Sequence, residues 1–321
     1  MRTFSFVAAA LAATAFLPGQ NLRQGLVDAH AVVVARQLGK TPHDDDLVLH
    51  RLQVLHDVRG AAGNATVTVL DWPKLALHQR PTPRQSRLYC LQDASATATR
   101  LGLPAANGPY FKMVGWAGAN PLVGAEIGND AHVRFAALLA AAEAGAAPAD
   151  TAGSLCALAL GQESALRVEA TKFLTERPDL RSKLGELQWS QLLSRASGEM
   201  EDVPHKIALA ELCAEQKLDG TFEALVVGLG PVADPEYARA VGRIGRMLHG
   251  EDAANRLGTR LHQAGDPKDR AALLLALGAT NTTTALDALL RMDKKDAAVA
   301  AALREHRSPK AQEAAGSKAK K

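Results

Sequence analysis

The sequence has few aromatic residues and few cysteines. Aromatic side chains make up 4% of its 321 residues, while hydrophobic residues together make up 47%, so the apolar content is mainly Ala, Leu and Val. Such a composition favours closely packed helices. The three cysteines, Cys90, Cys156 and Cys213, are too few for a disulfide framework and lack the spacing of a zinc site. We expect Cys156 and Cys213 to be buried; whether any two of the three form a disulfide stays open.

The chain also lacks the common catalytic motifs. It contains no G-x-S-x-G, H-E-x-x-H or C-x-x-C pattern, so an enzyme would have to assemble its site from scattered residues. His50 and His56 lie on one predicted strand, but about 20 Å separates them there, which is too far for one shared metal ion. The acidic segment 43–46 resembles a solvated turn more than a calcium loop. We therefore expect no enzymatic activity, no metal and no cofactor.

The positive charge is confined to the ends of the chain. The formal net charge is +3, and the segment 308–321 alone carries four lysines and one glutamate. Arg2 adds a further positive charge, so the net charge of the chain between Arg2 and residue 308 is close to −1. A basic surface for nucleic acid is therefore not expected. We predict that 308–321 is a basic, disordered tail.

The only long apolar run is at the N-terminus, and it is too short to span a bilayer. Arg2 precedes the apolar residues of 4–17, and Ala13-Thr14-Ala15 has the small-residue pattern of a signal-peptidase site. The sequence predicts a signal peptide over 1–15 and a periplasmic or secreted protein of bacterial type, with no membrane span. The alternative is a cytoplasmic protein with an apolar start.

Helix-start signals recur through the second half of the chain. Asp234-Pro235 and Asp266-Pro267 are 32 residues apart, and weaker starts precede them at Glu163 and Asp202. Asp caps free N–H groups, and Pro at the first helical position lacks the N–H that would be orphaned. A basic residue follows each start by four or five positions. This spacing predicts an α-solenoid of helix pairs over 129–307.

These repeats resemble HEAT repeats, in which helix pairs often begin with an acidic cap and carry a basic residue one turn later. The resemblance covers a little under half of the chain and rests on the segments 167–174 and 270–277. It implies a binding or scaffolding surface and no catalytic residues. An irregular helical domain that happens to have two Asp-Pro caps is the alternative. Gly242, Gly245 and Gly258 fall inside predicted helices, where they either allow close helix contact or are simply tolerated.

The first half has the period of β-strands. Five apolar or β-branched runs, separated by Gly- and Pro-containing breaks, predict a small OB-like β-barrel over 28–115; the runs are 30–36, 47–58, 64–70, 87–91 and 110–114. The strand order resembles that of netrin-like modules and of tissue inhibitors of metalloproteinases. Those inhibitors use a mature N-terminal cysteine, and no cysteine lies near the predicted cleavage point. The predicted fold class is thus α+β and multidomain, a barrel followed by a helical-repeat domain.

The Gly-rich stretch Gly115–Asp130 joins the two predicted domains. It contains neither G-x-x-x-x-G-K-[ST] nor G-x-G-x-x-G, so a phosphate-binding loop is disfavoured. We expect an interdomain linker over 116–128, with Trp116 packed at the junction.

Three functional hypotheses remain. The first is a non-enzymatic scaffold that binds another protein or peptide through the helical repeats, with Arg239, Arg243 and Arg246 as one stripe of guanidinium groups. A solvated face, with Glu236 paired to Arg239 or Arg243, is the plainer interpretation of this stripe. The second hypothesis is a protease-inhibitor-like binder acting through barrel loops. The third is an enzyme with a site in Gly115–Asp130.

Overall fold

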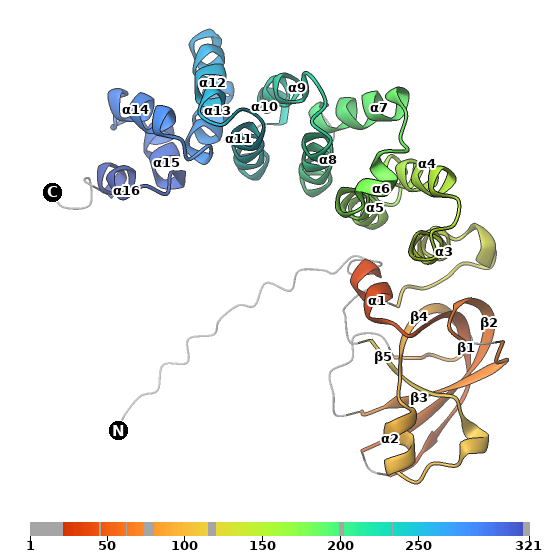
Figure 1. The fold of residues 1–321 in the computed structure, drawn as a ribbon. Coiled ribbons are helices and arrows are strands. Elements are labelled where there is room, and N and C mark those ends of the chain that lie inside the picture. The colour runs from red at the N-terminus through yellow and green to blue at the C-terminus, as the bar shows by residue number, and fades with distance from the viewer. Residues whose placement is uncertain are drawn as a thin grey trace, which may run out of the picture. The chain divides into compact units, whose positions relative to one another are not determined.

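The chain forms two compact units. A computed structural model describes residues 22–44, 46–61, 63–73, 80–114, 120–198, 202–232 and 234–316, and its contacts divide the chain into Met1–Ala136 and Ala137–Lys321 (Figure 1). The predicted signal peptide and Trp116 lie outside the described residues. The architecture is the expected one, a β-barrel followed by a helical half, and each unit is treated separately below.

The first unit is built around a closed barrel of five strands. The strands are β1 (Ala31–Pro42), β2 (Val48–Arg59), β3 (Thr66–Asp71), β4 (Ser86–Asp93) and β5 (Tyr110–Met113). They close in the order β1-β2-β3-β5-β4, in which β3 and β5 are parallel and every other pair is antiparallel. The helices α1 (Leu22–Asp28) and α2 (Ser95–Arg100) and the 3-10 turns η1 (Ala105–Asn107) and η2 (Ile127–Asn129) complete this part.

Alternate residues of the strands fill the barrel. Side chains at every second position point to one face of a strand, so a half-buried strand sends its apolar set inward. Val33 and Ala35 of β1 meet Val67 and Val69 of β3 and Tyr89 of β4 in one buried cluster. The register of β1 on β2 shifts three times, the last shift falling between Gln37 and Gly39. Such irregularities re-aim side chains, and this last one lies next to a polar site described below.

The predicted linker over 116–128 is in part a component of the barrel unit. Val123 N donates to Ser86 O at 3.0 Å, and Leu88 N donates to Pro121 O at 3.0 Å, so residues 121–123 extend along the outer edge of β4. The side chain of Asn120 accepts a hydrogen bond from Cys90 N at 2.9 Å. This corrects the expected boundary, because the free edge of β4 satisfies the backbone groups of this segment and holds it in place.

The second unit is helical throughout. Its helices in chain order are α3 (Ala131–Glu143), which crosses the division between the units, α4 (Pro148–Ala159), α5 (Ser164–Glu176), α6 (Pro178–Arg181), α7 (Glu186–Ser197), α8 (Val203–Glu215), α9 (Thr221–Val227), α10 (Leu229–Val232), α11 (Pro235–His249), α12 (Asp252–Gln263), α13 (Pro267–Ala279), α14 (Thr283–Arg291), α15 (Ala297–Glu305) and α16 (Pro309–Gly316).

These helices pack in two rows, as expected for stacked helix pairs. In one row, which we call the inner row, α5, α8, α11, α13 and α15 each pack on the next. The helices α4, α7, α9, α12 and α14 lie along the other side of the unit, which we call the outer row (Figure 1). Along the chain, outer and inner helices alternate, so each pair contributes one helix to each row.

Aspartate caps the inner-row helices, as the sequence predicts. Asp234 Oδ1 accepts from Glu236 N at 2.8 Å, and Asp266 Oδ1 accepts from Lys268 N at 2.7 Å. Asp202 and Asp296 cap α8 and α15 in the same way. Glu163, in contrast, makes no side-chain cap at the start of α5. The four aspartates account for the periodic signal, since a short carboxylate reaches free N–H groups that the longer Glu163 side chain does not reach here.

Two glycines allow inner-row helices to approach closely. A Cβ at Gly242 of α11 would lie 2.2 Å from Ala276 O of α13, and a Cβ at Gly278 of α13 would lie 2.2 Å from Ala302 O of α15. A Cβ at Gly245 would likewise lie 2.5 Å from the Phe222 ring of α9. Nothing lies within 4 Å of the corresponding point at Gly258. Close approach therefore explains Gly242 and Gly245, and Gly258 is simply tolerated.

Residues 309–316 form the helix α16, which corrects the expectation of a disordered tail from residue 308. Ser308 Oγ accepts a hydrogen bond from Ala311 N at 3.2 Å, Pro309 occupies the first turn, and Ala311 is fully buried. A good cap and a small residue that fits against α15 stabilise this helix despite its lysines. Residues 317–321 lie outside the described residues. All three cysteines are buried and free, as expected for Cys156 and Cys213.

Candidate functional site

The arginine stripe of α11 divides into one paired and two exposed members. Arg239 is half-buried; its guanidinium lies 2.6 Å from Glu236 Oε1 and 2.8 Å from Glu305 Oε1. The hydrogen bond to Glu305 raises the pKa of Arg239 above its usual value. Arg243 and Arg246 are exposed, and within the described ranges neither has an ion pair or a side-chain hydrogen bond. Arg239 therefore has a structural role, and the other two are available to a partner.

The stripe lies on the open side of the inner row. The opposite face of α11 is buried, through Tyr237, Ala240, Val241 and Ile244, against the neighbouring helices. Tyr237 Oη donates to Ala196 O at 2.9 Å, which anchors this face. A helix held in this way presents its arginines in a fixed orientation.

An apolar groove lies on the next inner-row helix, beside the start of α11. Ala271 and Leu275 of α13 lie 32 positions after Arg239 and Arg243, so the next repeat has short side chains where α11 has long ones. The result is a groove of about 430 Å³ across α13, with α15 on its far side. Its lining comprises Asp234, Pro235, Lys268, Ala271, Ala272, Leu275, Ala298 and Ala301.

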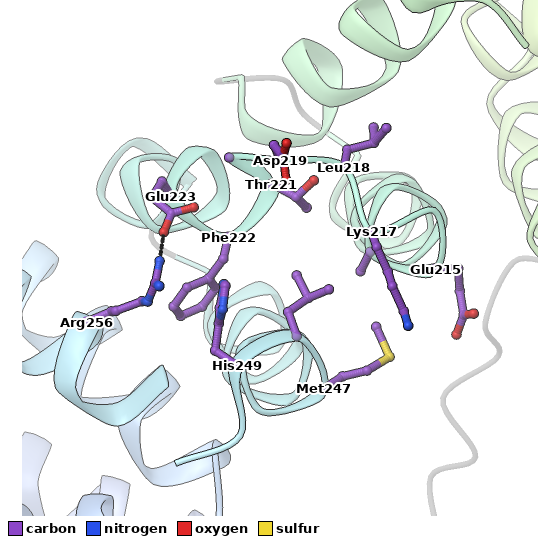
Figure 2. A pocket seen from close by; sticks show the side chains of 13 residues that line it. Glu215, Lys217, Leu218, Asp219, Thr221, Phe222, Glu223, Met247, His249 and Arg256 are labelled. Carbon is purple, nitrogen blue, oxygen red and sulfur yellow. Dashed lines mark hydrogen bonds and ion pairs between the residues drawn. The ribbon is translucent and has the colours of Figure 1, made fainter. Parts of the chain in front are cut away.

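A larger and more polar pocket of about 640 Å³ lies where α8 and α11 end (Figure 2). Phe222 and His249 pack ring against ring at its centre, with centroids 5.3 Å apart, and Met247 extends from the end of α11 (Figure 2). The Glu223 carboxylate and the Arg256 guanidinium form an ion pair at one side. The hydroxyl of Thr221 is buried without a partner among the described residues. The pocket is lined by acidic and basic side chains and by one aromatic surface. It lies at the C-terminal end of α11, just after Arg246.

The barrel unit contains a third site, a buried polar network. His50 Nε2 lies 3.2 Å from Asp71 Oδ2, and His50 Nδ1 lies 2.9 Å from the amide nitrogen of Gln37. Arg80 Nε lies 3.0 Å from the same Oδ2 and 3.2 Å from Asp71 Oδ1. Gln37, His50 and Asp71 are 7%, 5% and 2% exposed. They border a pocket of about 510 Å³ whose other lining residues include four prolines.

The chemistry of this network defines the state of His50. Burial lowers the pKa of His50, and the Asp71 carboxylate opposes that shift only in part. His50 is therefore neutral near pH 7. A carboxylate only accepts hydrogen bonds, so His50 Nε2 carries the proton and donates to Asp71. Nδ1 then accepts from the Gln37 amide, and both ring nitrogens are occupied. His50 is consequently a structural and positioning group, and it has no lone pair free for acid–base chemistry.

The other residues considered from the sequence, namely His56, the acidic turn 43–46 and the Gly-rich stretch, are not part of these sites. His56 is exposed, whereas His50 is buried, so the two do not share an environment. Asp44 Oδ1 accepts from Asp46 N at 2.7 Å, as in an ordinary turn. In the described part of the chain, no group of three or more His, Cys, Asp or Glu side chains is arranged to hold a metal ion. Of Gly115–Asp130, residues 115–119 are not described, and residues 120–130 line none of the three pockets above.

Sequence reasoning missed the polar network. Its members come from three different strands and one loop, and nothing in their spacing marks them as neighbours. One signal was present: His50 alternates with Val48 and Leu52 on the inward face of a predicted strand, where a polar side chain needs a buried partner.

Comparisons with known proteins do not place the chain in a family: no family model, no curated protein and no solved structure matches it significantly. Among the helices that the structure describes, none is both long and apolar enough to cross a membrane.

Proposed function

We propose that this protein is a non-enzymatic binding or scaffold protein that holds an acidic segment of another protein on the inner row of its helical unit. The observation that carries the proposal is that the exposed Arg243 and Arg246 of α11 and the groove across α13 belong to the same row of packed helices. Arginine offers bidentate hydrogen bonds to carboxylates, and the groove offers apolar contact to the residues between them.

The arrangement favours a partner chain over a small molecule. The stripe, the groove and the pocket of Figure 2 together extend over α8, α9, α11, α12, α13 and α15. Solenoid surfaces distribute their contacts over several repeats in this way. Arg243 and Arg246, the latter also close enough to Glu251 to lower the pKa of its carboxyl, give the surface positive charges that an acidic partner would complement.

A site-specific cross-linking experiment tests this proposal. A photoreactive amino acid is placed at Leu275 in the groove and, as a matched probe of the outer row, at Arg260 of α12. After irradiation in an extract of the source cells, the Leu275 probe should give a defined adduct with an acidic protein, and the Arg260 probe should not. Equal adducts from both positions would contradict the proposal.

Charge reversal provides the second arm. Arg243→Glu/Arg246→Glu should remove the adduct, whereas Arg260→Glu/Arg291→Glu, which changes the net charge equally on exposed outer-row positions, should retain it. Arg239 is left unchanged because its ion pair with Glu305 is structural. An adduct that survives the first double substitution would exclude the stripe from binding.

We also propose that the protein is exported, on the basis of Arg2, the apolar run and Ala13-Thr14-Ala15. N-terminal sequencing of the protein purified from the periplasm or the medium should begin near Ala15. An intact Met1 on correctly localised protein would refute export by cleavage.

A further inference from the structure

An ion pair joins the two walls of the inner-row groove. Pro235 of α11 and Ala301 of α15 both line this groove, and its floor belongs to α13. Arg239 follows Pro235 by four positions, so it lies one turn further along the same face of α11. Glu305 stands in the same relation to Ala301 on α15. The Arg239 guanidinium and the Glu305 carboxylate meet at 2.8 Å, so the ion pair connects α11 with α15 just beyond the groove.

This ion pair is one of several contacts that hold α15 in place. The helix also packs on α13 and α16 through an apolar face. Arg239 has a second carboxylate, because Glu236 Oε1 lies 2.6 Å from its guanidinium. The side chains of Arg239 and Glu305 are each 28% exposed, and ion pairs that solvent reaches stabilise a fold only a little. The contact between them can therefore open while both helices stay in place.

Glu305 shows which chemical group this place accepts. Arg239, Arg243 and Arg246 lie at i, i+4 and i+7 on α11, so a carboxylate on the first is in line with carboxylates on the other two. The planar fork of donors on each guanidinium fits a carboxylate. Arg243 and Arg246 are exposed, whereas Glu305 fills the place on Arg239 and adds a negative charge beside the stripe. An acidic segment thus meets two open places and one that is occupied from within the chain.

The spacing of the stripe matches an extended chain. The helical rise of about 1.5 Å per residue separates Arg239 from Arg243 by about 6 Å along the axis of α11. Alternate residues of an extended chain are about 6.6 Å apart, and their side chains point to the same side. Carboxylates at alternate positions of an extended segment therefore have the spacing of the three arginines.

We propose that Arg239 is a third carboxylate subsite of the inner-row surface, occupied in the free protein by Glu305 in place of a carboxylate of the partner. An acidic segment that binds Arg243 and Arg246 exchanges its own carboxylate for that of Glu305, so the ion pair opens as the partner binds. Glu305 thereby lowers the affinity for every acidic segment and selects for those with acidic residues at alternate positions. This inference rests on the proposed function, since it needs an acidic partner on this surface.

Binding of octaglutamate to the full-length protein tests the exchange. Titration calorimetry is carried out in 0.15 M salt, where exposed charges more than about 8 Å apart are largely screened from one another. The wild type should bind saturably. Glu305→Gln, which keeps the size of the side chain and removes its charge, should bind about two to five times more tightly. Glu313→Gln removes the same charge from an exposed position on α16 and should bind as the wild type does.

A second background separates exchange at Arg239 from general repulsion. In Arg239→Gln the subsite is absent, so the further change Glu305→Gln should no longer raise the affinity. A gain of equal size in both backgrounds would assign the effect of Glu305 to its charge alone and would overturn the subsite.

One measurement needs only the wild-type protein for the titration. The side-chain Nε–H NMR signal of Arg239, assigned from its absence in Arg239→Lys, should shift on saturation with octaglutamate together with the signals of Arg243 and Arg246. An Arg239 signal that stays unmoved while the other two shift, or equal affinities of the wild type and Glu305→Gln, would overturn the subsite and leave the proposed function intact. No saturable binding of octaglutamate to any of these proteins would contradict an acidic partner on this surface, and the subsite with it.

Discussion

The barrel and the helical unit satisfy their buried polar groups in different ways. In the helical unit, many of these groups find partners within one turn: Thr171 Oγ1 donates to Arg167 O at 2.7 Å, and Thr280 Oγ1 donates to Leu277 O at 2.7 Å. In the barrel, Gln37, His50 and Asp71 are hydrogen-bonded to one another across 34 residues of sequence. Local partners survive small shifts of a helix, whereas a network between strands depends on their register.

This difference predicts where a single substitution is most damaging. The largest effect should come from Asp71→Ala, which leaves His50 and Arg80 without their shared carboxylate inside the barrel. Leaving the buried His50 N–H without an acceptor costs on the order of 3 kcal/mol, and the loss of the partly exposed Arg80 pair adds little. Urea unfolding should show this loss of stability. Asp57→Ala on exposed β2, where the side chain only accepts from Ala61 N, should cost about 1 kcal/mol or less; equal losses would show that the network is not a stabilising unit.

The next effect concerns a buried histidine of the helical unit. His205 is 2% exposed, and burial, with a contribution from the charge of Arg167, lowers its pKa to about 4. Between pH 6.5 and 4, the unfolded chain therefore binds a proton that the folded chain does not bind. The stability of the helical unit should fall as the pH falls through this window, by about 3 kcal/mol in total.

His205→Asn removes the titrating group, so the difference in unfolding free energy between the wild type and this variant should itself depend on pH between 6.5 and 4. His50 of the barrel contributes with the same sign in both proteins and cancels in that difference. His262→Asn on the exposed face of α12 serves as the control. A difference independent of pH would contradict the assignment.

A smaller effect distinguishes glycines that allow close packing from one that is only tolerated. Gly242→Ala and Gly278→Ala each place a methyl group against a backbone oxygen of the next inner-row helix, so the helices must separate. We expect each to destabilise the protein by about 1–3 kcal/mol. Gly258→Ala, where the space is open, should stabilise it by about 0.5–1 kcal/mol. Thermal melting of the three variants measures both signs, and a stabilising Gly242→Ala would contradict the close approach.

The smallest expected effect belongs to the helix caps. Asp234→Ala removes two hydrogen bonds to the first turn of α11 and should cost about 1 kcal/mol. Glu163→Ala should be nearly neutral, because Glu163 makes no side-chain cap. Denaturant midpoints of the two variants compare them directly. Equal costs would mean that the acidic residue acts through its charge near the helix start rather than through the cap.

Most of the helical unit could be predicted because its signals are local. Asp202, Asp234 and Asp266 act within four residues of their own positions, and Gly242 is visible inside a helical pattern. The strands of the barrel were also predictable, from the alternation of apolar and polar residues. The predicted strand ends agree with the structure to within a few residues, except that β1 continues to Pro42. The prediction of a disordered tail was wrong for residues 309–316, because the burial of Ala311 depends on a neighbouring helix that composition does not reveal.

The candidate sites divide along the same line. The sequence by itself determined that Arg239, Arg243 and Arg246 share one face of a helix, because the helical period alone decides this. Only the tertiary structure decided that Glu305 engages Arg239 and that Ala271 and Leu275 line a groove on the next inner-row helix. The assembly of Gln37, His50, Asp71 and Arg80 likewise required the strands to be paired. Periodicity and capping involve residues a few positions apart, so the sequence alone shows them. Buried polar partners and grooves are formed by segments that come into contact only after folding.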